Sequence, residues 1–236
     1  TGVQAQRYMD RYGLTNADFA PVSVQLRSNA STNPLAWYFE KPITIDDHQN
    51  SRWIVDPVFR LLDCCQESDG GVAILVTTEE RVKDLKQIPV RIDHATQSVP
   101  FETETVTNFY HSDLTVFDSG VHSGAELFGR TGLTPADIQV GMLYDHFTIA
   151  VFWHLESMGF CKPGEASDFI KDGHLALDGS IPLSPNGGLI GEAYIHGMNL
   201  ATEAVRQIRG TASNQVDNVE HALLAAGMSG AILGRC

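Results

Sequence analysis

Short apolar runs alternate with helical patterns along most of this chain, and this alternation limits the folds open to it more than any other feature. Residues 72–78 form a continuous, largely β-branched run bounded by glycine, and residues 140–144 form a shorter apolar run directly before a helical pattern over 147–158. Strands that are apolar on both faces are typical of a sheet covered on both sides. The sequence therefore predicts an α/β fold with a central buried sheet between helical layers.

Further elements follow from spacing, capping residues and glycines that end helices. Residues 3–28 have helical spacing interrupted by Gly13 and Pro21, with Thr15 as an N-cap. Helices or turns are also predicted over 44–51, 79–85, 120–129, 134–138 and 199–209, and strands over 90–95 and after 219–224. A domain boundary is expected near residues 87–89.

The charge distribution disfavours two classes of partner. The 236 residues include 29 acidic and 16 basic side chains, giving a net charge of −13 without a basic stripe. A nucleic-acid-binding surface and an anionic membrane surface are therefore disfavoured. No apolar run approaches the length of a membrane span. The sequence starts without Met or a signal-peptide pattern, so we expect it to begin in mid-protein.

The cysteines and histidines give no sign of a metal site. The four cysteines, Cys64, Cys65, Cys161 and Cys236, lack C-x-x-C spacing, and the histidines are scattered. We therefore expect reduced core cysteines, a cytoplasmic location and no metal. His94 lies in a predicted strand, where a satisfied core or edge histidine is the simpler interpretation.

Three reactive side chains follow the apolar run 140–144 and precede the helical pattern that begins at Phe147. They are Tyr144, Asp145 and His146. The carboxyl ends of strands open onto ligand clefts in α/β folds, and buried polar groups cost free energy unless they have partners. A binding or catalytic role is one interpretation. The alternative, in which Asp145 caps the next helix while the other two side chains pack, stays open.

Two glycine-rich segments also carry candidate residues. Residues 184–197 place Tyr194 and His196 beside several glycines, among them Gly187 and Gly188, whose backbone can approach a ligand closely. Residues 225–231 form a small-residue turn around Gly227 and Met228, which is equally well explained as a tight packing crossover.

Taken in order, these segments resemble the thiolase superfamily, and most closely its sterol-carrier-protein branch. The resemblance covers almost the whole chain, through residues 12–15, 27–34, 51–52, 57–63 and 68–74 and the second half. It implies a layered α-β-α fold, with an incomplete N-terminal half over 1–89 (loop region and last strand) and a complete C-terminal half over 90–236. The family segment that bears the nucleophilic cysteine is absent from this sequence.

The departures from the family pattern concern catalysis. Tyr144-Asp145-His146-Phe147 stands where sterol-carrier-type thiolases have His-Asp-Cys-Phe, and Ala193-Tyr194-Ile195 stands where thiolases have Gly-His-Pro. Ala225-Ala226-Gly227 replaces a Cys-x-Gly motif. A Claisen enzyme needs a thiolate activated by histidine and a second acid–base group, so thiolysis is not expected.

Tyrosine at both positions resembles lipid-transfer-protein-type steroid side-chain aldolases. The resemblance implies retro-aldol cleavage of a β-hydroxyacyl-CoA, whose hydroxyl lies on steroid C17, to propionyl-CoA and a 17-ketosteroid in sterol catabolism. Tyr144 and Tyr194 would be the acid and base in an order that stays open. Asp145, His146 and His196 would support them, and Gly187, Gly188, Gly227 and Met228 would line the substrate. No cofactor is implied, because coenzyme A is part of the substrate.

Other functions remain open from the sequence. They are an atypical acyl-CoA thiolase and a non-catalytic acyl-CoA or lipid carrier, and the two tyrosines would then be buried residues bonded to backbone carbonyls. The family resemblance also implies a homodimer of the thiolase-like subunit. It further implies a small acyl-CoA-binding partner protein with a zinc ribbon and an OB fold.

Overall fold

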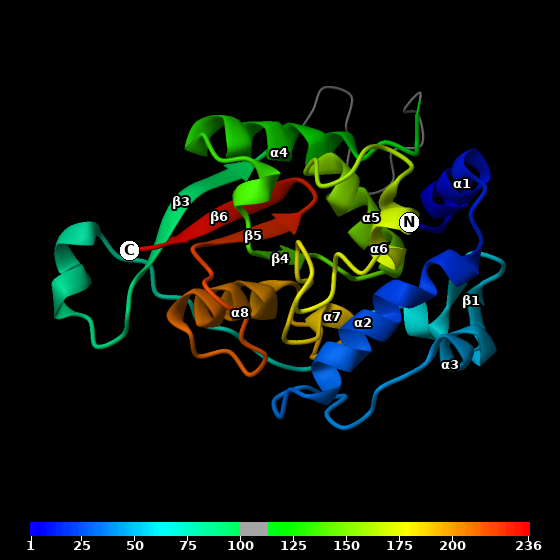
Figure 1. The fold of residues 1–236 in the computed structure, drawn as a ribbon, viewed down its shortest axis with the longest axis horizontal. Coiled ribbons are helices and arrows are strands. Elements are labelled where there is room, and N and C mark those ends of the chain that lie inside the picture. Colours follow the sequence, from blue (N-terminus) through cyan, green and yellow to red (C-terminus); the bar gives the residue numbers. More distant parts are fainter. Residues whose placement is uncertain (100–112) are drawn as a thin grey trace.

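The computed structural model describes residues 1–99 and 113–236 (Figure 1). Its helices are α1 (Gly2–Tyr12), α2 (Ala20–Ser31), α3 (Ile45–Asn50), α4 (Asp118–Thr131), α5 (Thr148–Ser157), α6 (Ala166–Lys171), α7 (Gly188–Gly191) and α8 (Met198–Arg209). Its strands are β1 (Trp53–Val55), β2 (Phe59–Arg60), β3 (Val90–Gln97), β4 (Val140–Leu143), β5 (His221–Ala226) and β6 (Ser229–Arg235). Four short 3₁₀ turns are η1 (Asn16–Asp18), η2 (Leu61–Asp63), η3 (Glu79–Asp84) and η4 (Pro135–Asp137).

The main sheet has the strand order β3-β6-β5-β4. Strand β4 runs parallel to β5, whereas β3–β6 and β5–β6 are antiparallel pairs. Strands β5 and β6 form a hairpin in which Ala226 pairs with Ser229 across the two-residue turn Gly227-Met228. Gly227 has a φ of 72°, which such turns favour. The strands predicted over 90–95, over 140–144 and at the end of the chain are confirmed.

Helices cover the sheet on both faces, as the α/β prediction requires. Figure 1 shows α4 along one face, in contact with β3 and β6, and α8 along the other, in contact with β4 and β5. The layered α-β-α arrangement is confirmed. None of the helices in the described part of the chain has the length and apolar character needed to cross a membrane.

Helix α5 is the central helix of the core. Eight of its ten residues are buried, and a helix that is apolar all round must be enclosed by protein. Phe152, on this helix, meets Tyr8 of α1 and Phe19 edge-on at ring-centroid distances of 6.2 and 5.3 Å. The predicted helix over 147–158 is confirmed, and its packing fixes the chain directly after the Tyr144 segment.

A network around Asp63 ties the N-terminal segments to the start of α5. The Asp63 carboxylate is fully buried and accepts hydrogen bonds from Asn16 Nδ2 at 2.7 Å, the Arg60 backbone N–H at 2.7 Å and Thr148 Oγ1 at 2.8 Å. His48 Nε2 lies 2.8 Å from Asp63 Oδ1, the oxygen that Thr148 also bonds. Four donors converge on this one carboxylate, and the sequence pattern did not reveal it.

The strand predicted over residues 72–78 is wrong. These residues form no strand, and Leu75 and Val76 are 85% and 68% exposed. A strand that is apolar on both faces needs neighbouring strands and covering layers, and no strand among residues 1–99 and 113–236 pairs with this segment. The helix predicted directly after it is the 3₁₀ turn η3. The division near residues 87–89 stays a prediction.

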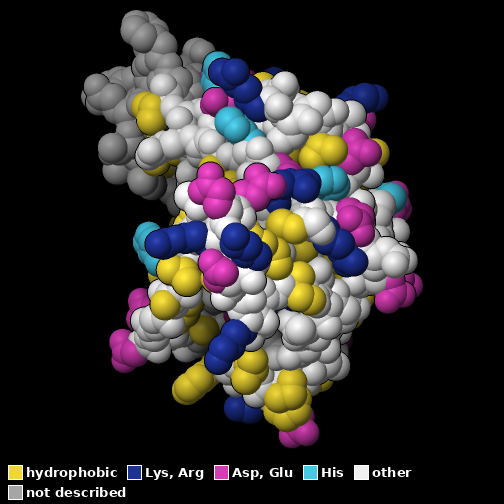
Figure 2. All heavy atoms as spheres, turned by 90° about the vertical axis from the view of Figure 1, so that its left-hand side faces the viewer, with side chains coloured by type: hydrophobic (Ala, Val, Ile, Leu, Met, Phe, Trp, Pro, Cys, Tyr) yellow, Lys and Arg dark blue, Asp and Glu magenta, His cyan; other side chains and the backbone are white. Residues whose placement is uncertain are grey.

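Figure 2 shows the side of the molecule on which η3 and the C-terminus lie in Figure 1. Hydrophobic side chains on this face are interspersed with basic and acidic ones. The exposed large hydrophobic residues of the segment from 74 to 99 are Ile74, Leu75, Val76, Leu85, Ile88, Ile92 and Val99.

Candidate active site

Two phenols meet beyond the carboxyl end of strand β4. Tyr144 follows β4 and Tyr194 follows α7, and their hydroxyl oxygens lie 2.9 Å apart, although the residues are 50 positions apart in the sequence. The Tyr194 hydroxyl also lies 2.9 Å from His196 Nδ1. The structure therefore brings three of the predicted site residues into one hydrogen-bonded chain, Tyr144–Tyr194–His196.

The sheet and a glycine place the Tyr144 ring. The Tyr144 backbone N–H donates to Ala225 O at 2.8 Å, which continues the parallel β4–β5 ladder by one step. Gly197 has a φ of 82°, and a Cβ at this position would lie 2.8 Å from the Tyr144 ring. Glycine is therefore required where the chain after His196 crosses that ring. Gly197 was not among the predicted site residues, although its position after Tyr194-Ile195-His196 was a usable signal.

Asp145 joins the two tyrosine-bearing segments and does not contact the phenols. Its buried carboxylate accepts hydrogen bonds from the backbone N–H groups of Leu189, at 2.8 Å, and Ile190, at 3.0 Å. The capping interpretation was right in kind but named the wrong helix: Asp145 caps α7, whereas Phe147 occupies the N-cap position of α5. Burial raises the pKa of Asp145 to about 7, against the opposing effect of these N–H donors.

His146 packs against Tyr144, with its ring centroid 5.0 Å from the phenol ring. Its Nδ1 is buried and has no hydrogen-bond partner within the described residues. Burial lowers the pKa of His146 to about 4, an effect partly offset by the nearby Tyr144 backbone. The imidazole beside Tyr144 is therefore neutral at neutral pH.

We expect the ring resonances of His146 to show no titration between pH 8 and pH 5. An unfolded chain takes up this proton near pH 6.5, whereas the folded protein does so only near pH 4. His146 therefore contributes a loss of stability as the pH falls from about 6.5 to about 4, and no further change above that range. NMR titration, with the signal assigned by its loss in His146→Gln, measures this. A midpoint near 6.5 would show that the ring is solvated.

Gly187 and Gly188 are buried between α2 and Asp145. A Cβ at Gly187 would lie 2.9 Å from Ala30 Cα, and one at Gly188 would lie 2.4 Å from Asp145 Oδ2. Close packing therefore accounts for glycine at both positions. Their contact with substrate stays a prediction.

Gly188→Ala is expected to lower the free energy of unfolding by about 2–5 kcal/mol, because it adds a steric clash to a left-handed backbone. Gly132→Ala is the matched control, since Gly132 has a similar φ of 73° and nothing within 4 Å of its Cβ position. The control should lose only about 1–2 kcal/mol. Urea denaturation of both variants measures the difference, and equal losses would show that the Asp145 contact is unimportant.

The turn at Gly227 and Met228 packs against α4 and the segment before it. Ser123 Oγ donates to Gly227 O at 3.2 Å, and a Cβ at Gly227 would lie 2.7 Å from the Phe117 ring. The tight packing expected for this segment is observed, and the connection that it makes is a hairpin turn between β5 and β6. Met228 is 38% exposed, and a role for this turn in substrate binding stays a prediction.

The cysteine thiols near the core are poor nucleophiles. All four cysteines are free, as predicted, but Cys64, Cys65 and Cys161 are only half-buried and Cys236 is exposed. Burial raises the pKa of Cys64 to about 12 and that of Cys65 to about 11. These two thiols are therefore protonated at neutral pH.

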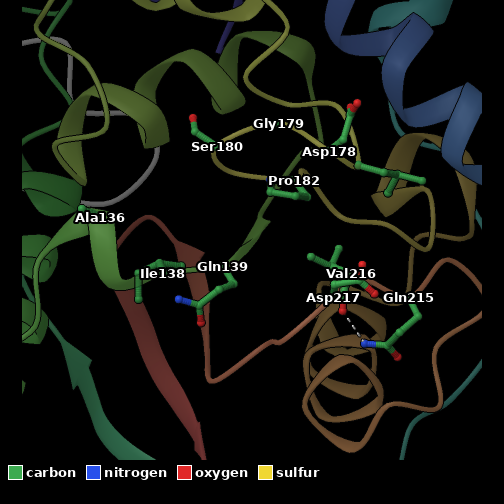
Figure 3. Close-up of a pocket in the computed structure, with 11 residues that line it drawn as sticks. Ala136, Ile138, Gln139, Asp178, Gly179, Ser180, Pro182, Gln215, Val216 and Asp217 are labelled. Atoms are coloured by element: carbon green, nitrogen blue, oxygen red, sulfur yellow. Dashed lines mark hydrogen bonds between the residues drawn. The ribbon is translucent and has the colours of Figure 1, made fainter.

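A surface hollow of about 400 Å³ has no tyrosine in its lining (Figure 3). It is lined by residues around the start of β4, among them Ile138, Gln139 and Pro182, whereas Tyr144 follows the other end of that strand. No predicted site residue lines this hollow.

Within the described ranges, no group of three or more His, Cys, Asp or Glu side chains could hold a metal ion. His94 lies on edge strand β3, with Nε2 3.7 Å from Glu126 Oε1.

A family model described as thiolase C-terminal domain-like matches residues 102–234. The chain belongs to this thiolase-like family. The predicted superfamily and fold are thereby confirmed. The matched residues include Tyr144, Tyr194, all of β4 and β5, and β6 except its last residue.

This thiolase-like chain is similar to two curated relatives over 98% of its length. It is 51% identical to 17-hydroxy-3-oxo-4-pregnene-20-carboxyl-CoA lyase of Mycobacterium tuberculosis and 49% identical to the steroid side-chain-cleaving aldolase of Thermomonospora curvata. It covers 60% of each. A solved structure described as an Ltp2-ChsH2(DUF35) aldolase superposes with a TM-score of 0.95 at 47% identity, over 99% of this chain and 62% of the other.

Proposed function

We propose that the protein containing this thiolase-like chain is a carbon–carbon lyase. It cleaves the side chain of a 17-hydroxy steroid C22-oyl-CoA by a retro-aldol reaction, giving propionyl-CoA and a 17-ketosteroid in sterol catabolism. The observation that carries the proposal is the hydrogen bond between Tyr144 Oη and Tyr194 Oη. The names of the two relatives, a lyase for such a CoA thioester and a steroid side-chain-cleaving aldolase, support the substrate class.

The phenol pair matches the proton balance of this reaction. A base removes the C17 hydroxyl proton, the C17–C20 bond breaks as the C17 carbonyl forms, and the bonding electrons pass to C20 as a thioester enolate. An acid then protonates C20. One proton leaves oxygen and one arrives on carbon, so two phenols that share a hydrogen bond suffice without a covalent nucleophile.

The surroundings of the two phenols favour different roles. Burial raises the pKa of Tyr144 above its usual value, and the hydrogen bond with Tyr194 adds to that rise. Tyr144 therefore stays protonated and is the proposed acid for C20. Tyr194 contacts both Tyr144 and His196, and His196 is exposed. We assign the base to Tyr194, with His196 accepting its proton, while His146 and Asp145 hold the Tyr144 segment.

We also propose the quaternary assembly and location implied by the resemblance. The solved relative is described as an aldolase with a DUF35 component, which supports a small acyl-CoA-binding partner with a zinc ribbon and an OB fold. A homodimer and a cytoplasmic location complete the proposal.

The test is a mass measurement of the products formed from a 17-hydroxy steroid C22-oyl-CoA. The full-length protein is incubated with this thioester, with and without the DUF35 partner. Equal amounts of propionyl-CoA and 17-ketosteroid are expected without added coenzyme A. Products that appear only with free coenzyme A would indicate a thiolase, and tightly bound but intact substrate would indicate a carrier.

A further inference from the structure

Residues 63–68, called here the strap, run beside both tyrosine-bearing segments. On the Tyr144 side, Thr148 Oγ1 donates to Asp63 at 2.8 Å, and the Cys65 backbone N–H donates to His146 O at 3.0 Å. Cys64 forms an antiparallel bridge with Phe147. The first half of the strap is thus bonded to the chain that directly follows Tyr144.

The second half of the strap is bonded to the Tyr194 segment. The Gln66 backbone N–H donates to Leu189 O at 3.1 Å, and the Tyr194 backbone N–H donates to Ser68 Oγ at 3.2 Å. Ser68 Oγ itself donates to Gln66 O at 3.0 Å, which orients its lone pairs toward Tyr194. Glu67 forms a parallel bridge with Tyr194.

The strap is also anchored away from the phenols, at Asp63 and at Gln66. Asp63 is held by His48 and Asn16, and the Gln66 side chain accepts a hydrogen bond from Tyr38 Oη at 2.7 Å. Beyond the strap, a Cβ at Gly70 would lie 2.5 Å from Ile195 Cδ1, so the chain also packs closely against the residue after Tyr194.

We infer that the strap sets the distance between the two phenols, and that Ser68 is a positioning residue for Tyr194. Its kinetic consequence rests on the proposed function. The two hydroxyls belong to segments far apart in the sequence, so their separation depends on whatever connects those segments. Asp145, which belongs to the Tyr144 segment, bonds the Tyr194 segment directly. The strap is a third segment, and it bonds both of them. A hydrogen bond weakens steeply when its donor and acceptor are misaligned, and the rate of proton transfer between the phenols then falls.

The test compares Ser68→Ala with Ser68→Thr in the full-length protein with its DUF35 partner. Ser68→Ala removes the acceptor of the Tyr194 N–H and should lower kcat about tenfold while KM changes less than about twofold. Amide exchange in a peptide covering residues 192–198 should become faster. Ser68→Thr keeps the hydroxyl and should restore both. The matched control is Ser31→Ala, which removes a hydroxyl donating only to Ser28 O on the exposed part of α2.

Each outcome decides the inference. Unchanged kcat and unchanged exchange in Ser68→Ala would overturn it, and so would a change in KM alone, which indicates a substrate contact. If the wild-type protein does not cleave the thioester, the proposed function fails, but the exchange measurement still judges the strap. If Ser68→Ala does not fold, Tyr38→Phe supplies the same two readouts by releasing the Gln66 side chain of the strap, and the same unchanged values would count against the strap.

Discussion

Tyr194→Phe is expected to lower kcat for side-chain cleavage about a thousandfold and to leave the fold intact, since a positioned acid or base contributes about 10²–10⁴. The change removes only the hydroxyl that bonds both Tyr144 and His196, so the chain from the half-buried Tyr144 phenol to the exposed His196 imidazole is broken. Steady-state kinetics of the full-length protein, with circular dichroism as a check on folding, measure the effect.

The matched control is Tyr8→Phe, because the Tyr8 hydroxyl donates to Glu156 far from the site. This variant should keep normal turnover. Tyr144→Phe should also lose most of its activity, and it should abolish deuterium exchange at the α-carbon of propionyl-CoA, whereas Tyr194→Phe should retain part of it. Near-normal cleavage by both site variants, with intact folds, would show that the tyrosines are not the acid and base. Retained exchange in Tyr144→Phe would reverse their roles.

Asp63→Ala is expected to lower the free energy of unfolding by about 3–5 kcal/mol, the range for breaking a fully buried, paired charge. The substitution leaves the buried donors of Asn16, Arg60, His48 and Thr148 without their acceptor. Urea denaturation gives the change in midpoint.

Asp137→Ala is the matched control for Asp63→Ala. Asp137 has the same local role in η4 as Asp63 has in η2, accepting the backbone N–H of the residue three positions earlier, but it is exposed. Its replacement should have a much smaller effect. Comparable losses would attribute the effect of Asp63 to capping alone and not to the buried network.

Local pattern was sufficient to predict the elements that surround the site. Strand β4 and helix α5 are apolar on every side, so their burial did not depend on knowing their neighbours. Residues 72–78 have the same local character but are largely exposed, because a strand forms only where another strand pairs with it. Sequence alone does not say which apolar run finds such a neighbour.

The site shows the same limit at the level of side chains. Tyr144 and Tyr194 were predicted from their positions in a family pattern, and nothing local to either one indicated that their oxygens meet at 2.9 Å. The alternative interpretation made Asp145 a cap of the helix that follows it, yet its partners lie 44 and 45 residues away. The Asp63 network escaped prediction because its members come from four separate segments with no shared spacing.

The way the two tyrosine segments are held has a consequence for redesign. Asp145 and Ser68 accept hydrogen bonds from backbone N–H groups of the Tyr194 segment, and Ala225 O accepts one from the backbone N–H of Tyr144. None of these contacts uses a phenol oxygen. The backbone of the two segments is therefore held independently of the phenol oxygens. We expect that other aromatic side chains at positions 144 and 194 would change the acid–base chemistry while the surrounding backbone stays in place.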